Sequence, residues 1–143
     1  MDNFIHASEE IALFCRMNVN VKKNLPIRSS EMGMLIYLVK TEGEKTPNAV
    51  AKFFNVTKAM ATNMTTSLLK QEYIVKEQSM IDKRSFSLIP TKKAVELVES
   101  AYTEYFKTMT LLQEKMGKEK FAEFIDLLER ANEILVEEKK NHE

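Results

Sequence analysis

The residues best suited to contact a ligand lie between positions 57 and 70, in a segment that contains no acidic side chain. If this segment is a helix, the face opposite its apolar positions carries only small, neutral-polar or basic side chains. These are Ala59, Thr62, Asn63, Thr66 and Lys70. Asparagine can bond adenine through two atoms, threonine hydroxyls reach bases or phosphates, and an alanine methyl can meet a thymine methyl. The pattern predicts that the first four of these residues read base edges in the major groove of duplex DNA.

The same segment offers three contacts for DNA phosphate groups, namely Thr57, Lys58 and Lys70. Lys58 falls in the first helical turn, where its long stem spans more naturally to the backbone than to the bases. The alternative is an ordinary solvated helix face. Solvated faces in this chain usually carry glutamate, and its absence here favours DNA.

A second basic cluster, Asp82-Lys83-Arg84, lies between two short strand-like runs. A guanidinium suits a narrow minor groove, where the negative potential of the phosphates is concentrated. Asp82 could hold Arg84 in position. We therefore expect this tripeptide to form a minor-groove contact, although a surface turn of mixed charge is a common alternative.

The formal net charge is zero, which argues mildly against a nucleic-acid partner. The charge is unevenly distributed, because residues 57–93 carry seven basic and three acidic residues, whereas residues 94–143 carry seven and twelve. A basic middle beside an acidic end indicates a surface for an anionic polymer, placed apart from a surface with another role. Chance clustering of solvated charge is the alternative.

Two helices joined by a short turn must position the first of these surfaces. Thr46-Pro47 is a cap followed by proline at the first helical position, Asn55-Val56 makes a turn, and Thr57 caps the next helix. The inward positions are Val50, Phe53 and Phe54 in one helix and Ala61, Met64 and Leu68 in the other. This arrangement is a helix-turn-helix.

The flanking segments complete a winged domain. Before the pair, a helix with an apolar face begins at Ser29 or Ser30 and closes at Gly43. After it, the runs 73–77 and 85–89 form a hairpin, and Pro90 stops the second strand. We therefore predict a mainly α fold with a small β-hairpin, a winged helix-turn-helix whose DNA-binding lobe spans about residues 29–90.

Amphipathic stripes occupy both ends of the chain, in a helix over residues 3–21 and in helices over residues 91–140. Thr91 caps a long helix, and Gly117 interrupts the pattern before a last helix. The stripes consist of Phe4, Ala7, Ile11, Phe14, Met17 and Val21, of Ala94, Val98, Ala101, Tyr105, Met109, Leu112 and Met116, and of Phe121, Phe124, Leu128, Ala131 and Leu135. A lone amphipathic helix cannot bury its own apolar face. We expect residues 1–143 to form a single domain that dimerises with a second copy through these terminal helices.

Several of these features resemble one known family, the multiple-antibiotic-resistance (MarR) regulators. The similarity spans nearly the whole chain and includes the leading helix and the Thr57–Leu68 segment. Asp82-Lys83-Arg84 is similar to the family's Asp-x-Arg wing motif, and Leu88-Ile89-Pro90-Thr91 to its Leu-Thr helix entry. The segment from Lys118 to Leu128 resembles the family's last helix. Three positions depart from the pattern: Glu72 and Ala94 replace common glycines, and Pro90 is unusual beside Thr91.

The resemblance implies a homodimer joined by the first and last helices, with two recognition helices in successive major grooves of a palindromic operator and wings in the flanking minor grooves. It also implies release of DNA by small, often aromatic or anionic effectors that bind between the dimer helices and the DNA-binding lobe. We therefore expect a sequence-specific repressor of transcription. The residues that would bind the effector are not identified by the sequence.

Other classes of function receive less support. No phosphate-binding glycine loop, metal-ligand spacing or nucleophile with a nearby base is present, so we expect neither an enzyme nor a cofactor or metal site. Cys15 is the only cysteine and is expected to be a buried structural thiol, with redox sensing as the alternative. No segment suggests export or membrane insertion, which favours a cytoplasmic protein. The strongest rival is a helical protein-interaction module that does not bind DNA.

Overall fold

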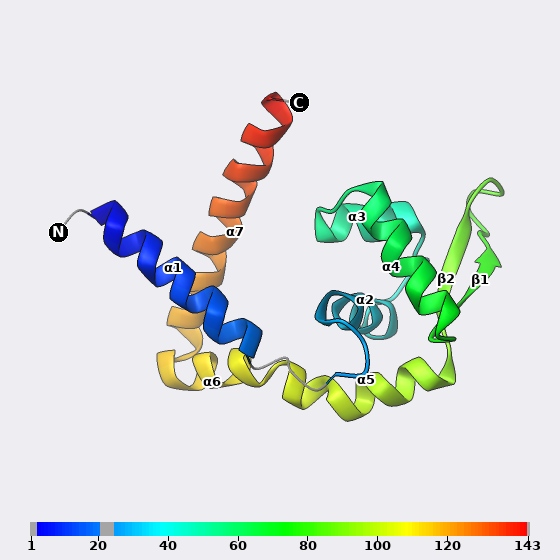
Figure 1. Cartoon of the computed structure of the whole chain (residues 1–143), viewed down its shortest axis with the longest axis horizontal. Coiled ribbons are helices and arrows are strands. Elements are labelled where there is room, and N and C mark those ends of the chain that lie inside the picture. Colours follow the sequence, from blue (N-terminus) through cyan, green and yellow to red (C-terminus); the bar gives the residue numbers. More distant parts are fainter. Residues whose placement is uncertain (1–2, 21–24, 143) are drawn as a thin grey trace. The chain divides into compact units, whose positions relative to one another are not determined.

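The computed structural model describes residues 3–20 and 25–142, which form seven helices and one two-stranded hairpin (Figure 1). In chain order the elements are α1 (Asn3–Asn20), α2 (Ser29–Lys40), α3 (Pro47–Phe54), α4 (Lys58–Lys70), β1 (Ile74–Gln78), β2 (Phe86–Pro90), α5 (Lys92–Tyr105), α6 (Lys107–Met116) and α7 (Lys118–Asn141). The predicted mainly α fold with a small hairpin is confirmed. Val21, the last apolar position expected in the first helix, lies outside the described residues.

The chain divides into two compact units, one ending at Tyr105 and the other beginning at Phe106. In the first unit, α2 packs against α4, α5 and β2, and α3 packs against α4. Its fully buried side chains come from four helices and from both strands, and include Met32, Val50, Leu68, Leu88 and Val98. Burial of these side chains supplies the main stabilisation of the lobe, because each removes a large apolar area from water.

Three threonines begin helices in this unit, as the sequence predicts. The Oγ1 atoms of Thr46 and Thr57 each accept a hydrogen bond of 3.1 Å from the backbone N–H three residues later. Thr91 Oγ1 accepts the Ala94 N–H at 3.3 Å in the same way. Each bond satisfies one of the N–H groups that a helix start leaves without a partner.

The ends of α2 differ from the prediction. The N-cap is Arg28 rather than Ser29 or Ser30, and the Glu31 carboxylate reaches back to accept the Arg28 backbone N–H at 3.1 Å. A carboxylate in the first turn thus accepts the N–H of the N-cap residue, whereas the expected serine N-cap would accept an N–H from within the first turn. At the other end, α2 stops at Lys40 with an extended cap residue, so Gly43 belongs to the following loop, where its φ is 91°.

The expected inward face of α3 is only partly buried. Val50 is fully buried and Phe54 is half-buried, but Phe53 is exposed. The Phe53 ring stacks on Tyr37 of α2 with ring centroids 4.2 Å apart, so one of its faces is covered and the other meets solvent.

The turn from α4 into the hairpin closes in a Schellman motif. The Glu72 N–H donates to the Leu69 carbonyl at 3.1 Å, and the Tyr73 N–H donates to the Leu68 carbonyl at 3.0 Å. Glu72 adopts a φ of 63°, in the left-handed region that glycine tolerates best. Residue 72 is one of the positions at which the sequence differs from the glycine that is common in the family it resembles.

Replacing Glu72 with glycine is expected to raise the free energy of unfolding by about 1 kcal/mol, because it removes the steric penalty of a side chain in the left-handed region. The carbonyl of residue 72, which accepts the Thr91 hydroxyl at 2.8 Å, is retained. Urea denaturation measures the change. Glu77→Gly, an exposed position inside β1, is the control and should destabilise the protein. A Glu72→Gly variant no more stable than the parent would contradict the strain argument.

The hairpin is antiparallel, with Ile74 opposite Pro90 and Gln78 opposite Phe86. Each strand begins and ends one residue later than the sequence predicts. The Leu88 N–H also donates to the Lys45 carbonyl at 2.7 Å, so the loop between α2 and α3 runs along the free edge of β2. That contact ties the wing to the loop that precedes the helix-turn-helix.

The second unit consists of α6 and α7, which pack against each other and are joined at Gly117. The single long helix expected after Thr91 is interrupted at Phe106, whose φ of −98° and ψ of 13° break the helical hydrogen-bond ladder. Gly117 has a φ of 90° and forms the predicted interruption before the last helix.

Apolar side chains remain exposed on the terminal helices of this single chain. On α1 they include Phe4, Ile5, Ile11 and Met17, and on α7 they include Leu127, Leu128, Ile134 and Leu135. Cys15 is likewise exposed, contrary to the expectation of a buried thiol, because α1 is largely uncovered in one chain. Across residues 3–20 and 25–142, no helix combines the length and hydropathy required to cross a bilayer.

Candidate nucleic-acid interface

The two faces of α4 divide as its sequence pattern requires. Ala61, Met64 and Leu68 point into the core, together with Thr65, which the sequence analysis did not include. The exposed side chains are Ala59, Thr62, Asn63, Thr66 and Lys70. All five candidate contacts therefore lie on the side of α4 that is open to solvent. That side offers hydroxyl, amide and methyl groups without any carboxylate.

The beginning of α4 is set by a tight turn. Asn55 takes a left-handed conformation with φ 52° and ψ 45°, which lets the chain reverse between α3 and α4. Thr57 then uses its side-chain oxygen to cap the helix, and Lys58 is exposed in the first turn. A lysine beside the positive end of the helix dipole creates a local site for an anion such as a phosphate group.

The wing tip holds its arginine in a defined position. Asp82 Oδ1 accepts the Arg84 backbone N–H at 3.0 Å and the Arg84 Nε–H at 3.3 Å. The Arg84 side chain is nevertheless 92% exposed, so its terminal nitrogens face solvent. Lys83, between them, is exposed as well. The structure thus brings the three predicted wing residues together at the tip, with Asp82 orienting Arg84.

A carboxylate far away in the sequence fixes the base of the tip. Ser87 Oγ donates to Glu44 Oε1 at 2.6 Å, and Ser79 also hydrogen-bonds this carboxylate. The hydrogen bonds from Ser79 and Ser87 hold the pKa of Glu44 below its ordinary value. Sequence reasoning missed Glu44, because no local pattern links a loop residue to a strand 43 positions later.

A second carboxylate connects α2 to α4. Glu31 is only 2% exposed and hydrogen-bonds Ser67 of α4 as well as the Arg28 backbone. Burial alone would raise the pKa of Glu31, but the hydrogen bonds from Ser67 and Arg28 and the Arg28 charge outweigh burial and lower it. The ionised form of Glu31 is therefore the form that the folded state stabilises.

Because the folded-state pKa of Glu31 is lowered, its contribution to stability is present above the ordinary value of 4.5 and is lost as the pH falls through the lowered value. Glu31→Gln is expected to reduce the free energy of unfolding by about 1–3 kcal/mol near neutral pH, the range for a buried charge-assisted hydrogen bond. The difference from the parent should shrink in acid. Urea titrations at several pH values measure it.

The control for this experiment is Glu96→Gln, because Glu96 is exposed and lies 4.0 Å from Lys92 on the surface of α5. Its effect should be close to zero at every pH. A Glu31→Gln variant whose deficit stays constant down to acid pH would contradict the assignment of an ionised buried carboxylate.

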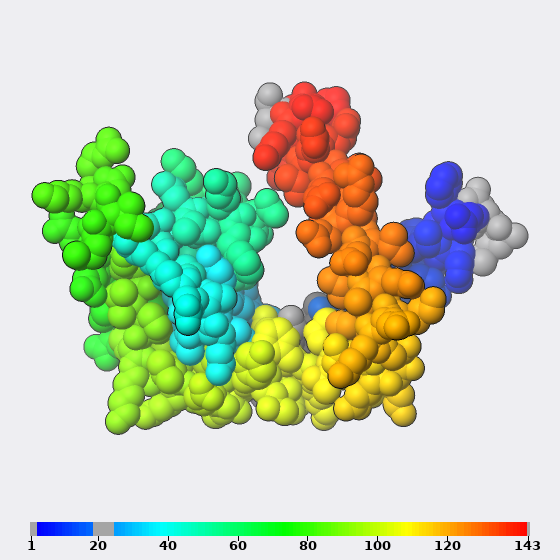
Figure 2. Space-filling model, turned by 180° about the vertical axis from the view of Figure 1, so that it is seen from behind, coloured from blue at the N-terminus to red at the C-terminus, as the bar shows by residue number. Residues whose placement is uncertain are grey.

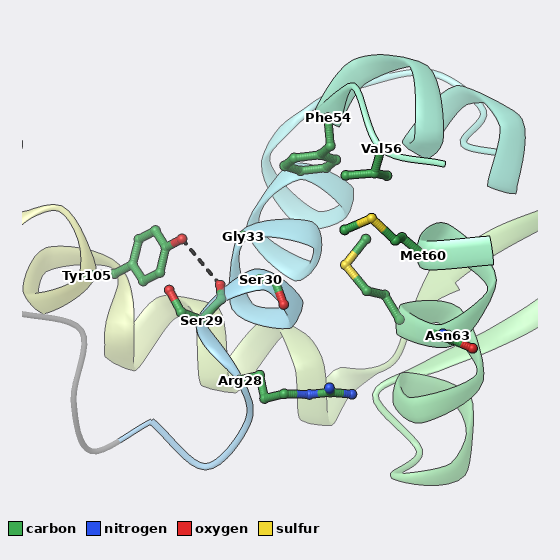
Figure 3. A pocket seen from close by; sticks show the side chains of 10 residues that line it. Arg28, Ser29, Ser30, Gly33, Phe54, Val56, Met60, Asn63 and Tyr105 are labelled. Atoms are coloured by element: carbon green, nitrogen blue, oxygen red, sulfur yellow. Dashed lines mark hydrogen bonds between the residues drawn. The ribbon is translucent and has the colours of Figure 1, made fainter. Parts of the chain in front are cut away.

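A pocket of about 530 Å³ opens beside α4 (Figure 3). Its lining comes from the start of α2, the α3–α4 turn, α4 and the end of α5, and includes Arg28, Gly33, Phe54, Met60, Asn63 and Tyr105. The Tyr105 hydroxyl donates to the Ser29 carbonyl at 3.4 Å and closes one side. Aromatic and thioether groups thus line a space that also has a guanidinium at its edge.

The chain is similar to a protein family and to several solved structures. Residues 29–86 match the model of the MarR family. A MarR/EmrR family transcriptional regulator from Acinetobacter sp. ADP1 is 16% identical, with 94% of this chain and 98% of that chain covered and a TM-score of 0.73. The S. aureus MepR–DNA complex is 17% identical over 93% of this chain and 98% of that chain, with a TM-score of 0.75.

A MarR protein from Peptoclostridium difficile is 20% identical over 99% of this chain and 93% of that chain, with a TM-score of 0.72. At these identities the structural likeness establishes the fold, which is the predicted winged helix-turn-helix. A comparison with curated proteins found no match. The segment matched by the family model contains α2, α3, α4, β1 and the wing tip, and hence every candidate DNA contact described above.

Proposed function

We propose that the chain is a DNA-binding regulator of transcription, because residues 29–86 match the model of the MarR family. One observation carries the proposal: the exposed face of α4 has no acidic side chain and lies in the same lobe as a wing that presents Arg84 to solvent. Positively charged and hydrogen-bonding groups on a helix and a hairpin fit the two grooves of a duplex.

The experiment that tests this function is a fluorescence-anisotropy titration of the protein with a random-sequence duplex over a series of salt concentrations. Binding should weaken steeply as salt rises, because each phosphate contact releases condensed counterions. Absence of salt-dependent binding would favour the alternative, a helical protein-interaction module without DNA binding.

Within this proposal, the DNA contacts divide by role. Base reading falls to Ala59, Thr62, Asn63 and Thr66, phosphate binding to Thr57, Lys58 and Lys70, and minor-groove contact to Asp82, Lys83 and Arg84. The supporting observation is their exposure on α4 and at the wing tip, together with the helix-start position of Thr57 and Lys58. Residues 29–90 then constitute the DNA-binding lobe.

We further propose a homodimer joined by residues 3–21 and 91–140, which reads a palindromic operator. The apolar side chains exposed on α1 and α7 support this proposal, since a single chain leaves them in water. Sedimentation equilibrium at micromolar concentration should give the mass of a dimer. A well-folded monomer that does not associate at that concentration would exclude it.

The pocket beside α4 supports a further part of the proposal, namely that a small aromatic anion releases the protein from DNA and relieves repression. A ligand there would touch Met60 and Asn63 of the recognition helix, and Arg28 would meet its charge. Benzoate is a suitable probe and should raise the melting temperature and weaken DNA binding. If Arg28→Gln responds to benzoate as the parent does, the ligand binds elsewhere. A role in binding chromosomal DNA also supports our proposal of a cytoplasmic location.

A further inference from the structure

The wing tip carries two apolar side chains that the proposed DNA contacts leave unused. Met80 is 93% exposed and Ile81 is 85% exposed, the highest values among the large apolar side chains of the described residues. Isolated exposed apolar residues are ordinary on protein surfaces. Here two adjacent ones lie immediately before Asp82-Lys83-Arg84, in the turn between β1 and β2, and Figure 2 shows this green hairpin at the left edge of the molecule.

The backbone that carries these side chains is held in place by hydrogen bonds. Ser79 is buried, and its Oγ accepts the backbone N–H groups of Ile81 at 3.1 Å and Asp82 at 3.0 Å. The Ser79 N–H donates to the Ser85 carbonyl at 3.2 Å and closes the turn. Glu44 adds hydrogen bonds to the same turn. The outward direction of Met80 and Ile81 is therefore a property of an ordered turn.

The hairpin itself offers little surface on which these side chains could fold back. Phe86 is the aromatic residue of β2 nearest the tip, and it pairs with Gln78 in the last rung of the hairpin. Lys76 Nζ lies over the Phe86 ring, 4.4 Å from its centroid, and occupies that face. A partner outside the lobe is then the remaining way to remove Met80 and Ile81 from water.

We propose that Met80 and Ile81 enter the minor groove of duplex DNA with Arg84 and pack against its apolar deoxyribose walls. This inference rests on the proposed DNA-binding function and extends it to a non-electrostatic contact. The position of these residues favours DNA as the partner. If Arg84 approaches a narrow groove, Met80 and Ile81, four and three residues earlier in the same turn, approach it as well. Methionine and isoleucine are among the side chains that proteins insert into minor grooves.

The test compares Met80→Ser, Ile81→Ser and the double variant with the parent, by anisotropy titration on duplex DNA over a series of salt concentrations. The double variant should bind about tenfold more weakly at every salt concentration, because burial of two apolar side chains is lost. The slope of log affinity against log salt should stay at the parent value, because no charge is removed. Arg84→Ala, in contrast, should reduce that slope.

Val75→Ser is the matched control, because Val75 is also an exposed apolar residue of the hairpin but lies on β1, opposite Ile89 and away from the tip. It should bind DNA as the parent does, and all variants should keep the parent's melting temperature. Netropsin, which fills A·T minor grooves, should weaken binding of the parent more than binding of the double variant.

The outcomes separate this inference from the function on which it rests. If the parent shows salt-dependent DNA binding and the double variant matches it, the apolar contact is wrong and the regulator function stands. An equal loss in Val75→Ser, or a change of salt slope in the double variant, would also overturn the contact. Absence of salt-dependent binding by the parent removes both the function and the inference.

Discussion

Replacing Asn63 with alanine is expected to weaken binding to the operator by about 1–3 kcal/mol per recognition helix, while binding to random duplex changes little. Asn63 lies on the exposed face of α4, within one turn of Ala59 and Thr62, where a side chain can reach base edges. Its amide carries the donor and the acceptor that pairing with adenine requires. Loss of such a pair changes discrimination between sequences, because phosphate contacts remain.

Lys58→Ala is the matched variant for this prediction. Its side chain is exposed in the first turn of α4 and should contact phosphate, so operator and random duplex should lose affinity alike. The salt slope should fall by about one for each contacted phosphate. Titration of both variants on both duplexes gives the comparison, and both should melt at the parent's temperature because neither side chain faces the core.

Equal losses on operator and random DNA for Asn63→Ala would show that the reading face is misassigned. Asn63 also lines the pocket toward α2, so it lies on one flank of the exposed face. A helix docked with a small rotation would transfer base reading to Thr62 or Thr66. Alanine variants of these two threonines would then show the operator-specific loss.

Arg84→Ala is expected to weaken DNA binding by about 1–3 kcal/mol per wing, the range for removal of a charge-assisted groove contact. The side chain is 92% exposed, so the variant should fold and melt as the parent does. Asp82→Asn should have a smaller effect, since it weakens the carboxylate that orients Arg84 and leaves the charge in place. Titrations at matched salt concentration measure both changes.

A control for Arg84 is Arg130→Ala, which removes an exposed arginine that is also paired with a carboxylate, Glu133 at 3.5 Å, but lies outside the segment matched by the family model. It should leave DNA binding unchanged. If Arg84→Ala binds the operator as tightly as the parent, the wing does not read the minor groove, whatever α4 does.

The sequence predicts helix starts well in this chain because capping is a local interaction. Thr46, Thr57 and Thr91 each bond an N–H only three residues away, and each begins a helix where expected. The predicted start of α2 was wrong for a related reason. Two serines offered hydroxyl caps, but the Glu31 carboxylate, favoured by its charge at the positive end of the helix, capped one residue earlier.

Features that depend on distant residues were not predictable from local pattern. Glu44 and Ser87 meet only after the hairpin has folded against the loop that precedes α3. The break at Phe106 has no glycine or proline to mark it, unlike the predicted one at Gly117. The exposed side of α4 was predictable, because a period of 3.6 residues separates its apolar and polar positions.

The hydrogen bonds that Ser79 and Glu44 accept in the wing tip also affect the entropy of association. A hairpin tip commonly samples many conformations in solution. When a partner binds only one of them, the tip loses conformational entropy, and this loss weakens binding. In this chain the tip turn from Ser79 to Arg84 is already ordered by its own hydrogen bonds and by the loop before α3. The wing is thus preorganised, so the backbone of its tip should lose little conformational entropy when its side chains contact DNA.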